Sequence, residues 1–280
     1  MDVVHDIATL RATLEGQRHV RTGLVPTMGN LHAGHLALVQ ACRQASDFCM
    51  VSIFVNPTQF GPNEDFANYP RTLDDDLRLL EAAGTDLVFN PSVDDMYPGG
   101  QDDHVSVTVG SLAHKLCGEA RPGHFDGVAT VVAKLFNIVA PNEAFFGEKD
   151  WQQLTLIRTM ARQLDMPLEV TGVPTVREPS GLAMSSRNKY LSDEERERAA
   201  LINRVLMRIK AAIERGDRAY ADAEARGARA LTAAGFDVDY VAVRDAVRLV
   251  PPDDDTRTLR ILAAARLGRA RLIDNVGVAI

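Results

Sequence analysis

VPTMGNLHAGHLALVQ, residues 25–40, is the stretch that decides the fold of this chain. It continues an apolar run at 19–25, is interrupted by Gly29 and Gly34, and returns to apolar residues at helical spacing over 36–42. This pattern predicts a strand, a glycine-containing turn and a helix. The first amides of a helix have no partner within it and mark the positive end of its dipole, so this turn suits an anionic ligand such as a phosphate.

Two histidines, His32 and His35, lie at the expected start of that helix. Imidazoles one helical turn apart can donate hydrogen bonds to the oxygens that gain charge at a reacting phosphorus, and Gly34 removes a side chain where a phosphate would approach. Two other interpretations of His-Ala-Gly-His remain open: a capping histidine beside a helix-packing glycine, and a pair of metal ligands. The chain has no Walker loop, and no G-x-G-x-x-G follows the first strand. If the protein binds a phosphate, a motif of another kind must bind it.

Composition narrows the class of protein. The 280 residues are 46% hydrophobic and 25% charged, and 31 Lys+Arg against 38 Asp+Glu give a net charge of −7. No basic cluster offsets this balance and no apolar run approaches about 20 residues, so neither nucleic acid nor a membrane is expected as a partner. Cys42, Cys49 and Cys117 lack the spacing of a zinc or redox motif, and no secretory leader is visible. We therefore expect a cytoplasmic protein with reduced thiols that binds small molecules.

Strand and helix patterns alternate outward from the opening stretch. Further strands are expected at 48–55, 86–90, 105–109, 144–147 and 168–173, and helices at 7–14, 73–83, 128–139 and 151–164. The alternation predicts an α/β fold, a Rossmann-like doubly wound, mostly parallel sheet with right-handed crossovers. The VSVTV run at 105–109 alternates in polarity, which predicts a strand with one exposed face.

The pattern changes after a connector at 174–187. One long helix is expected over 193–213 and another up to residue 234, followed by three antiparallel strand candidates at 237–246, 258–268 and 270–276. We therefore predict two domains: a Rossmann-like ligand-binding domain over 1–175, and a smaller α+β C-terminal domain over 176–280 that acts as a lid.

Two further stretches contain residues suited to phosphate. Lys149, in Phe-Gly-Glu-Lys-Asp at 146–150, follows a short core strand and would act as a point charge on phosphate oxygens. The alternative is a surface lysine paired with Glu148 or Asp150. In the connector, Met-Ser-Ser-Arg at 184–187 offers two hydroxyls and a guanidinium that could close over a triphosphate, or it forms an ordinary polar hinge.

Four blocks of sequence together resemble the pantothenate synthetase (pantoate–β-alanine ligase) family. They are PTMGNLHAGH at 26–35, SIFVNPTQFGPNEDFANYPR at 52–71, FFGEKDWQQL at 145–154 and REPSGLAMSSRNKYLS at 177–192. The chain beyond about residue 195 contributes no diagnostic motif. Within the wider HIGH-motif nucleotidyltransferase superfamily, HAGH is similar to the HIGH motif of class I aminoacyl-tRNA synthetases, and MSSRN to their KMSKS loop.

The resemblance implies a reaction and its participants. It implies ATP-dependent condensation of (R)-pantoate with β-alanine through a pantoyl-adenylate, with release of pyrophosphate and AMP, to give pantothenate. It also implies Mg²⁺ with the ATP and a homodimer formed through the N-terminal domain. Three acids in the first turn of the 73–83 helix, Asp74, Asp75 and Asp76, could help to hold Mg²⁺, and Asp75 is the candidate ligand. The alternative is that these acids only face the helix dipole.

The same resemblance assigns site residues. The implied catalytic residues are His35, as proton donor, with His32 and Lys149. The implied ATP-binding residues are Met28, Gly29, Asn30, Leu31, His32, Ala33, Gly34, His35, Gly147, Glu148, Lys149, Asp150, Val176, Met184, Ser185, Ser186 and Arg187. The implied binding residues for pantoate and β-alanine are Gln59, Gln153, Thr27, Met28 and Asn56.

The residue types suit this chemistry. The pantoate carboxylate must act as a nucleophile, and the neutral amides of Gln59 and Gln153 can orient it without the loss of nucleophilicity that a guanidinium clamp would cause. Two alternatives remain open: another adenylyl-transferring enzyme of the same superfamily, and a nucleotide-binding regulatory protein that has lost turnover.

Overall fold

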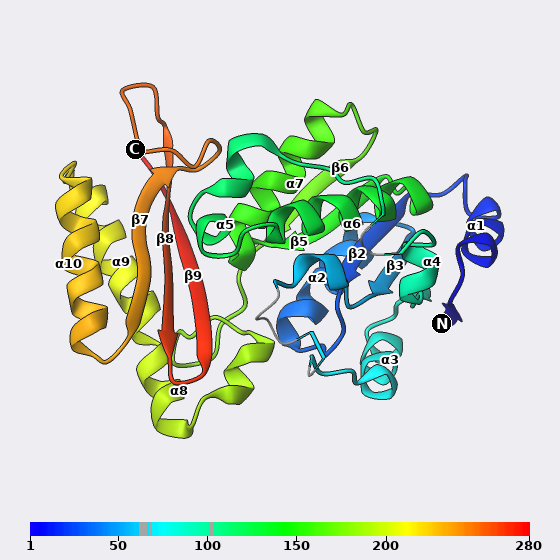
Figure 1. The fold of residues 1–280 in the computed structure, drawn as a ribbon, viewed down its shortest axis with the longest axis horizontal. Coiled ribbons are helices and arrows are strands. Elements are labelled where there is room, and N and C mark those ends of the chain that lie inside the picture. The colour runs from blue at the N-terminus through cyan, green and yellow to red at the C-terminus, as the bar shows by residue number, and fades with distance from the viewer. Residues whose placement is uncertain (62–65, 68, 101–102) are drawn as a thin grey trace. The chain divides into compact units, whose positions relative to one another are not determined.

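The computed structural model describes residues 1–61, 66–67, 69–100 and 103–280, which form two compact units (Figure 1). The N-terminal unit comprises Met1–His114, Arg121–Glu148 and Gln153–Pro174. The C-terminal unit comprises Lys115–Ala120, Lys149–Gln152 and Thr175–Ile280. Part of the 52–71 block, at 62–65 and 68, lies outside the described residues.

A six-stranded parallel sheet forms the centre of the N-terminal unit, as predicted. Its order is β1-β4-β3-β2-β5-β6, and its strands are β1 (Asp2–Val4), β2 (Thr22–Thr27), β3 (Phe48–Ile53), β4 (Leu87–Phe89), β5 (Glu143–Gly147) and β6 (Glu169–Val173). The chain moves outward in one direction from β2 and in the other from β5, so these two neighbours form the switch point of the sheet. Ligands of such sheets bind beyond the carboxyl ends of the strands at this point.

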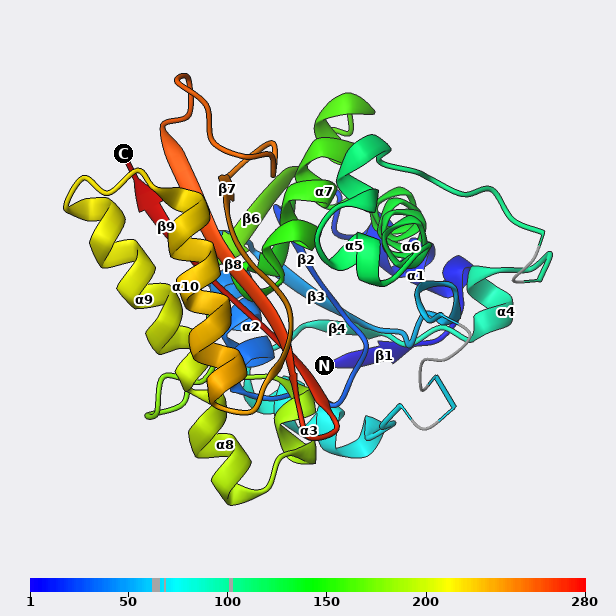
Figure 2. The same cartoon turned by 60° about the vertical axis from the view of Figure 1, so that its left-hand side comes forward.

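Helices cover both faces of this sheet. They are α1 (Ile7–Glu15), α2 (Ala33–Ala45), α3 (Leu73–Ala82), α4 (Val93–Met96), α6 (His124–Val139) and α7 (Trp151–Gln163), with 3₁₀ segments η1 (Pro57–Gln59), η2 (Gly110–His114) and η3 (Glu148–Asp150). Figure 2 shows α2 and α3 on one face and α1 and α6 on the other. On the first face Val39 of α2 and Leu80 of α3 pack against Val25, Val51 and Val88 of three adjacent strands.

The C-terminal unit has its own core and is of the predicted α+β class. A three-stranded antiparallel sheet of order β7-β8-β9 packs against α9 and α10. The elements are α5 (Cys117–Ala120), η4 (Ser186–Tyr190), α8 (Asp193–Ala199), α9 (Leu201–Glu214), α10 (Tyr220–Ala233), β7 (Asp237–Asp245), β8 (Thr258–Leu267) and β9 (Ala270–Ala279). In the described part of the chain no helix is long and apolar enough to cross a membrane.

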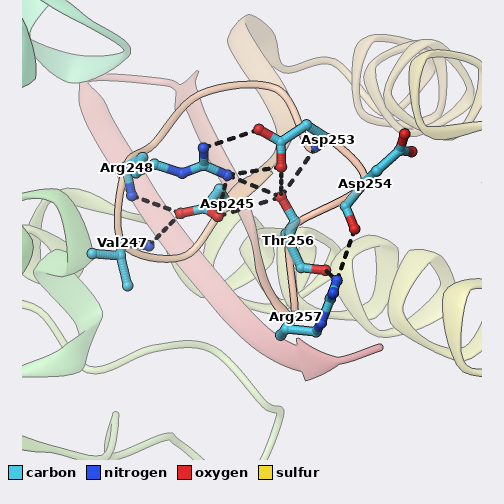
Figure 3. A network of polar contacts seen from close by, with 7 residues as sticks. All are labelled: Asp245, Val247, Arg248, Asp253, Asp254, Thr256 and Arg257. Carbon is cyan, nitrogen blue, oxygen red and sulfur yellow. Dashed lines mark hydrogen bonds and ion pairs between the residues drawn. The ribbon is translucent and has the colours of Figure 1, made fainter.

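Polar contacts hold the connection between β7 and β8 (Figure 3). Asp245 accepts the backbone N–H groups of Val247 and Arg248 at 3.0 and 2.7 Å, and the Arg248 guanidinium bonds both Asp245 and Asp253 at 2.9 Å. The Thr256 hydroxyl donates to Asp253 at 2.9 Å. The hydrogen bonds from Arg248 and Thr256 hold the pKa of Asp253 well below its ordinary value, because they favour the charged form of its carboxyl group.

Two predictions of secondary structure were wrong. Residues 105–109 form no strand: Val105 is 88% exposed, and the Val107 N–H donates to the Thr130 side chain at 2.9 Å. Alternating polarity makes a strand only where another strand supplies partners, and among the described residues none pairs here. The predicted single helix over 193–213 is α8 and α9, divided at Ala200, whose ψ of −14° departs from the usual value of about −42°. The short strand β1 was not predicted.

Candidate functional site

The turn after β2 is built on two consecutive residues with left-handed backbone. Gly29 has φ 77° and Asn30 has φ 51°. The Gly29 N–H donates to the Thr27 hydroxyl at 3.2 Å, and that hydroxyl donates to the Ser52 carbonyl at 2.8 Å, which ties the turn to β3. The side chain of Asp76, in the first turn of α3, accepts the N–H groups of the next two residues of the turn. The turn therefore delivers the chain to the N-terminus of α2 in a defined conformation.

His32 and His35 cap that helix reciprocally. The Gly34 N–H donates to His32 Nδ1 at 3.1 Å, and the His32 N–H donates to His35 Nδ1 at 3.3 Å. The two rings lie 4.1 Å apart between centroids. Because a backbone N–H can only donate, both Nδ1 atoms are acceptors, so each neutral imidazole carries its proton on Nε2. Each imidazole can therefore cap the helix through Nδ1 and donate to a ligand through Nε2.

Gln59 lies in η1 and is buried among polar partners. Its Oε1 accepts from Asn56 Nδ2 at 3.1 Å, and its Nε2 lies 3.1 Å from the sulfur of Met28. Asn56 is held in turn by the Tyr97 hydroxyl at 2.8 Å and by the Gly127 carbonyl at 3.1 Å. This network fixes the orientation of the Gln59 amide and connects it to the turn after β2.

Helix α6 supports η1 through backbone contacts. His124 Nδ1 lies 2.8 Å from the Gln59 carbonyl, within hydrogen-bonding distance. A Cβ on Gly127 would lie 2.3 Å from the Thr58 carbonyl oxygen, a distance that no side chain tolerates, so glycine is required for this approach. The remaining predicted acid-binding residue, Gln153, is half-buried in the first turn of α7.

In the C-terminal unit, Lys149 is held by strand β9. Asn275 Nδ2 donates to the Lys149 carbonyl at 2.8 Å. Lys149 Nζ lies 3.6 Å from Asp150 Oδ2, so an ion pair that belonged to the alternative interpretation of this lysine forms in the structure. The next residue, Trp151, stacks under the Arg260 guanidinium at 3.5 Å and donates its indole N–H to the Ala246 carbonyl at 2.8 Å. These contacts fasten the lysine segment to the C-terminal sheet.

The Met184–Arg187 segment is attached to the same strand. The Met184 N–H donates to the Val176 carbonyl at 3.0 Å, and Arg177 pairs with Ala183 in an isolated β-bridge. Arg177 also forms a two-pronged ion pair with Asp274 at 2.7 and 2.9 Å. Adjacent residues of β9, Asp274 and Asn275, therefore connect the two nucleotide-binding segments predicted in this unit.

Glu178 and Asn188 shape the serine loop itself. Ser185 Oγ accepts the Arg187 N–H at 3.2 Å and caps η4, while the buried Asn188 donates to Glu178 at 2.9 Å and to the Ala183 carbonyl at 3.1 Å. Glu178 also receives two bonds from Arg196, at 2.8 and 2.9 Å. The loop is thus an ordered turn in which Arg187 is exposed.

The acidic first turn of α3 has three carboxylates with different surroundings. Asp75 is exposed and pairs with Arg78, whereas Asp76 is buried against the turn after β2. Among the described residues no group of three or more His, Cys, Asp or Glu is placed to hold a metal ion.

Asp76 was predicted only as a Mg²⁺ ligand or a partner of the helix dipole, and Tyr97, Asp274 and Asn275 were not predicted as site residues. Two of them carry a recognisable signal. Asp76 lies on the same helical stripe as Leu73, Leu77 and Leu80, and Asp274 alternates with the buried Ala270 and Leu272. A charged residue in a core-facing position requires a polar partner inside the protein. Tyr97 and Asn275 follow no pattern that would have identified them.

Comparisons with known proteins agree on one family. Residues 2–277 match the family described as pantoate-beta-alanine ligase. The chain is 53% identical over 282 residues to a pantothenate synthetase of Methylococcus capsulatus, covering 100% of this chain and 99% of that protein. The crystal structure of pantothenate synthetase from Thermus thermophilus matches with TM-score 0.92 and 48% identity over 99% of each chain. The pantoate-beta-alanine ligase of Francisella tularensis, complexed with beta-gamma ATP and beta-alanine, matches with TM-score 0.82 and 34% identity, covering 99% of this chain and 97% of that one.

Proposed function

The chain belongs to the pantoate-beta-alanine ligase family, and we propose which of its residues perform the ATP-dependent ligation of pantoate to β-alanine. The chemistry proceeds in two steps. The pantoate carboxylate attacks the α-phosphorus of ATP and pyrophosphate leaves; the amine of β-alanine then attacks the acyl carbon of pantoyl-adenylate and AMP leaves. The ATP and β-alanine named for the Francisella tularensis ligase support both substrates here.

The reciprocal capping of His32 and His35 is the observation that carries the assignment of the reacting centre. It keeps both imidazoles at the N-terminus of α2 with Nδ1 as acceptor and Nε2 as donor. Negative charge builds on the phosphorus oxygens during attack, and two N–H donors with the positive end of a helix dipole stabilise it. His35 and His32 supply these donors, and the Met28–His35 segment that carries them binds ATP.

The acid substrates are bound by amides. Gln59, oriented by Asn56, donates to the pantoate carboxylate and later contacts β-alanine, and Gln153 contacts pantoate. Thr27, Met28 and Asn56 complete the walls of this site. An amide orients a carboxylate without neutralising its charge, so the nucleophile stays reactive while its geometry is restricted.

The remaining nucleotide contacts come from the two segments held by β9. Lys149, within Gly147–Asp150, and the 184–187 segment neutralise phosphate charge, and the Val176 backbone contacts adenine. Mg²⁺ enters with ATP as part of the substrate. Asp75 remains only a candidate for contact with it, since its exposed carboxylate pairs with Arg78.

Assembly and location are part of the proposal. We place the reaction in the cytoplasm, a reducing compartment, because Cys42, Cys49 and Cys117 are all free. A homodimer formed by the N-terminal domain is supported by the family resemblance, and sedimentation velocity would measure it.

A half-reaction assay tests the function. The enzyme is incubated with ATP, Mg²⁺ and pantoate, with and without β-alanine, while pyrophosphate and AMP are followed. We expect pyrophosphate without β-alanine, at one equivalent per active site, and continuous AMP only with it. AMP release that does not depend on β-alanine, or absence of pantoate-dependent pyrophosphate, would contradict the proposal.

A further inference from the structure

Asp76 differs from its two acidic neighbours in α3. Its side chain is 1% exposed, whereas Asp74 and Asp75 lie on the surface. Its Oδ2 accepts the Asn30 N–H at 2.8 Å and its Oδ1 accepts the Leu31 N–H at 2.7 Å. The Thr72 hydroxyl adds a third bond at 3.2 Å. Both carboxylate oxygens are therefore engaged, and both hold the backbone of one turn.

The turn that Asp76 holds is unfavourable by itself. Left-handed backbone at a residue other than glycine costs free energy and persists where the surroundings impose it. Asn30 is such a residue, at φ 51°, and it follows Gly29 at φ 77°. A Cβ on Gly29 would lie 2.9 Å from Asp76 Oδ2 and 3.2 Å from the Ile53 side chain. The carboxylate thus approaches the turn so closely that only glycine fits beside it.

The geometry of this turn determines where the next amides point. Asn30 and Leu31 immediately precede His32, the N-cap of α2. Hydrogen bonds from two successive N–H groups to one buried carboxylate restrict the torsions of both peptides. A buried carboxylate is itself costly unless its oxygens are satisfied, so the turn and Asp76 depend on each other.

We propose that Asp76 is a positioning residue for the adenylation half-reaction, acting through the turn at Gly29–Leu31 rather than by touching substrate. Its carboxylate holds this turn in the left-handed conformation, which places the α2 N-terminus and the two histidines for ATP. The inference rests on the proposed function, because it assigns to the turn a role in binding ATP. It predicts that loss of this carboxylate raises the KM for ATP and lowers the rate of adenylation, while the KM for β-alanine stays the same.

The test compares Asp76→Asn with Asp74→Asn, an exposed aspartate of the same helical turn. In Asp76→Asn one oxygen becomes an NH₂ group facing a backbone N–H, so at least one charge-assisted bond is lost. We expect the kcat/KM of pantoate-dependent pyrophosphate release to fall about 10- to 100-fold. The KM for ATP should rise and kcat per titrated active site should fall, with the KM for β-alanine unchanged. Asp74→Asn should match the wild-type protein.

The kinetic outcomes separate a positioning role from a purely structural one. A variant that is merely less folded loses active sites but keeps the wild-type KM for ATP and kcat per site, which would overturn the proposal. Wild-type kinetics in Asp76→Asn would also overturn it. If the wild-type protein itself releases no pantoate-dependent pyrophosphate, the proposed function fails instead.

Hydrogen exchange in the wild-type protein covers the case in which Asp76→Asn does not fold. The Asn30 and Leu31 amides have Asp76 oxygens as their acceptors, so we expect both to exchange slowly and their exchange to slow further with a non-hydrolysable ATP analogue. Exchange at the rate of unprotected amides, with or without the analogue, would show that the carboxylate does not hold the turn.

Discussion

Asn275 donates its side-chain amide to the backbone carbonyl of Lys149 at 2.8 Å, joining residues 126 positions apart. The Asn275 side chain also accepts from Arg260, which in turn stacks on Trp151. A backbone segment that carries a lysine proposed to bind ATP is thereby fixed by the last strand of the chain. Strand β9 therefore holds a segment that lies far from it in the sequence.

Removing this contact should affect ATP binding more than folding. In Asn275→Ala the Lys149 carbonyl loses its donor, and we expect the KM for ATP to rise about 3- to 10-fold and stability to fall by about 1 kcal/mol. Steady-state kinetics and chemical denaturation measure both. Asn203→Ala, which removes an amide 3.5 Å from Asp274, serves as the control and should change neither. An unchanged KM for ATP in Asn275→Ala would show that the Lys149 segment keeps its position without β9.

His35→Ala should nearly abolish the first half-reaction. It removes both the proposed donor to the reacting phosphate and the acceptor of the His32 N–H. We expect pantoate-dependent pyrophosphate release to fall about 100-fold or more, as with the loss of other transition-state donors. His19→Ala, at an exposed position before β2, is the matched control. Pyrophosphate release within a few-fold of wild type would remove His35 from the reacting centre.

Gln59 and Tyr97 should show graded effects on the acid substrates. Gln59→Ala removes the amide that we propose binds both acids, so the KM for both pantoate and β-alanine should rise while that for ATP stays constant. Tyr97→Phe removes only the hydroxyl that donates to Asn56, and we expect a smaller rise in the KM for pantoate with a loss of about 1 kcal/mol in stability. Initial-rate kinetics with each substrate varied in turn separate these effects. Equal KM values for wild type and Gln59→Ala would place that residue outside the acid site.

Gly127→Ala should destabilise the protein although it lies in a helix. At an open helical position this change usually stabilises by about 1 kcal/mol, since alanine is the better helix former. Here the new Cβ would meet the Thr58 carbonyl at 2.3 Å, so η1 must move away from α6. We expect a lower melting temperature and a higher KM for pantoate. A gain in melting temperature would mean that η1 and α6 are less closely packed.

The pH dependence of stability should report on Glu178. Hydrogen bonds from Arg196, with a further one from Asn188, lower the pKa of Glu178. The folded state therefore favours the charged carboxylate, and the unfolded state binds more protons between the two pKa values. This contribution is complete above the unfolded pKa of about 4.3 and is lost as pH falls through the lower folded value.

Urea unfolding between about pH 6 and pH 3 measures this contribution. Wild type should lose up to about 1 kcal/mol more than Glu178→Gln on acidification, a small value because Arg196 is half exposed. Parallel curves for the two proteins would show that the pair contributes nothing to stability. A steeper curve for Glu178→Gln would contradict the direction of the pKa change.

Local sequence patterns were sufficient for most of the fold. Apolar runs predicted β3 and β5, and the helical pattern from residue 193 predicted the start of α8, which Ser192 and Glu195 cap reciprocally. The patterns failed where pairing decides the structure. Strand β1 has only three residues, too few to show an alternation of polar and apolar side chains. It forms a strand because β4 provides an edge for parallel pairing. Residues 105–109 do alternate in polarity, but among the described strands none pairs with them.

The sequence by itself determined the family and the parallel sheet, and it predicted the segments that would carry the chemistry, because motifs and hydrophobic periods are local properties of the chain. Tertiary structure alone decided how those segments are held. That Asp76 holds the turn before His32, and that Asn275 holds Lys149, depends on helix α3 and strand β9 packing against residues distant in sequence. Hydrogen bonds require atoms about 3 Å apart, and only the folded chain brings these residues within that distance.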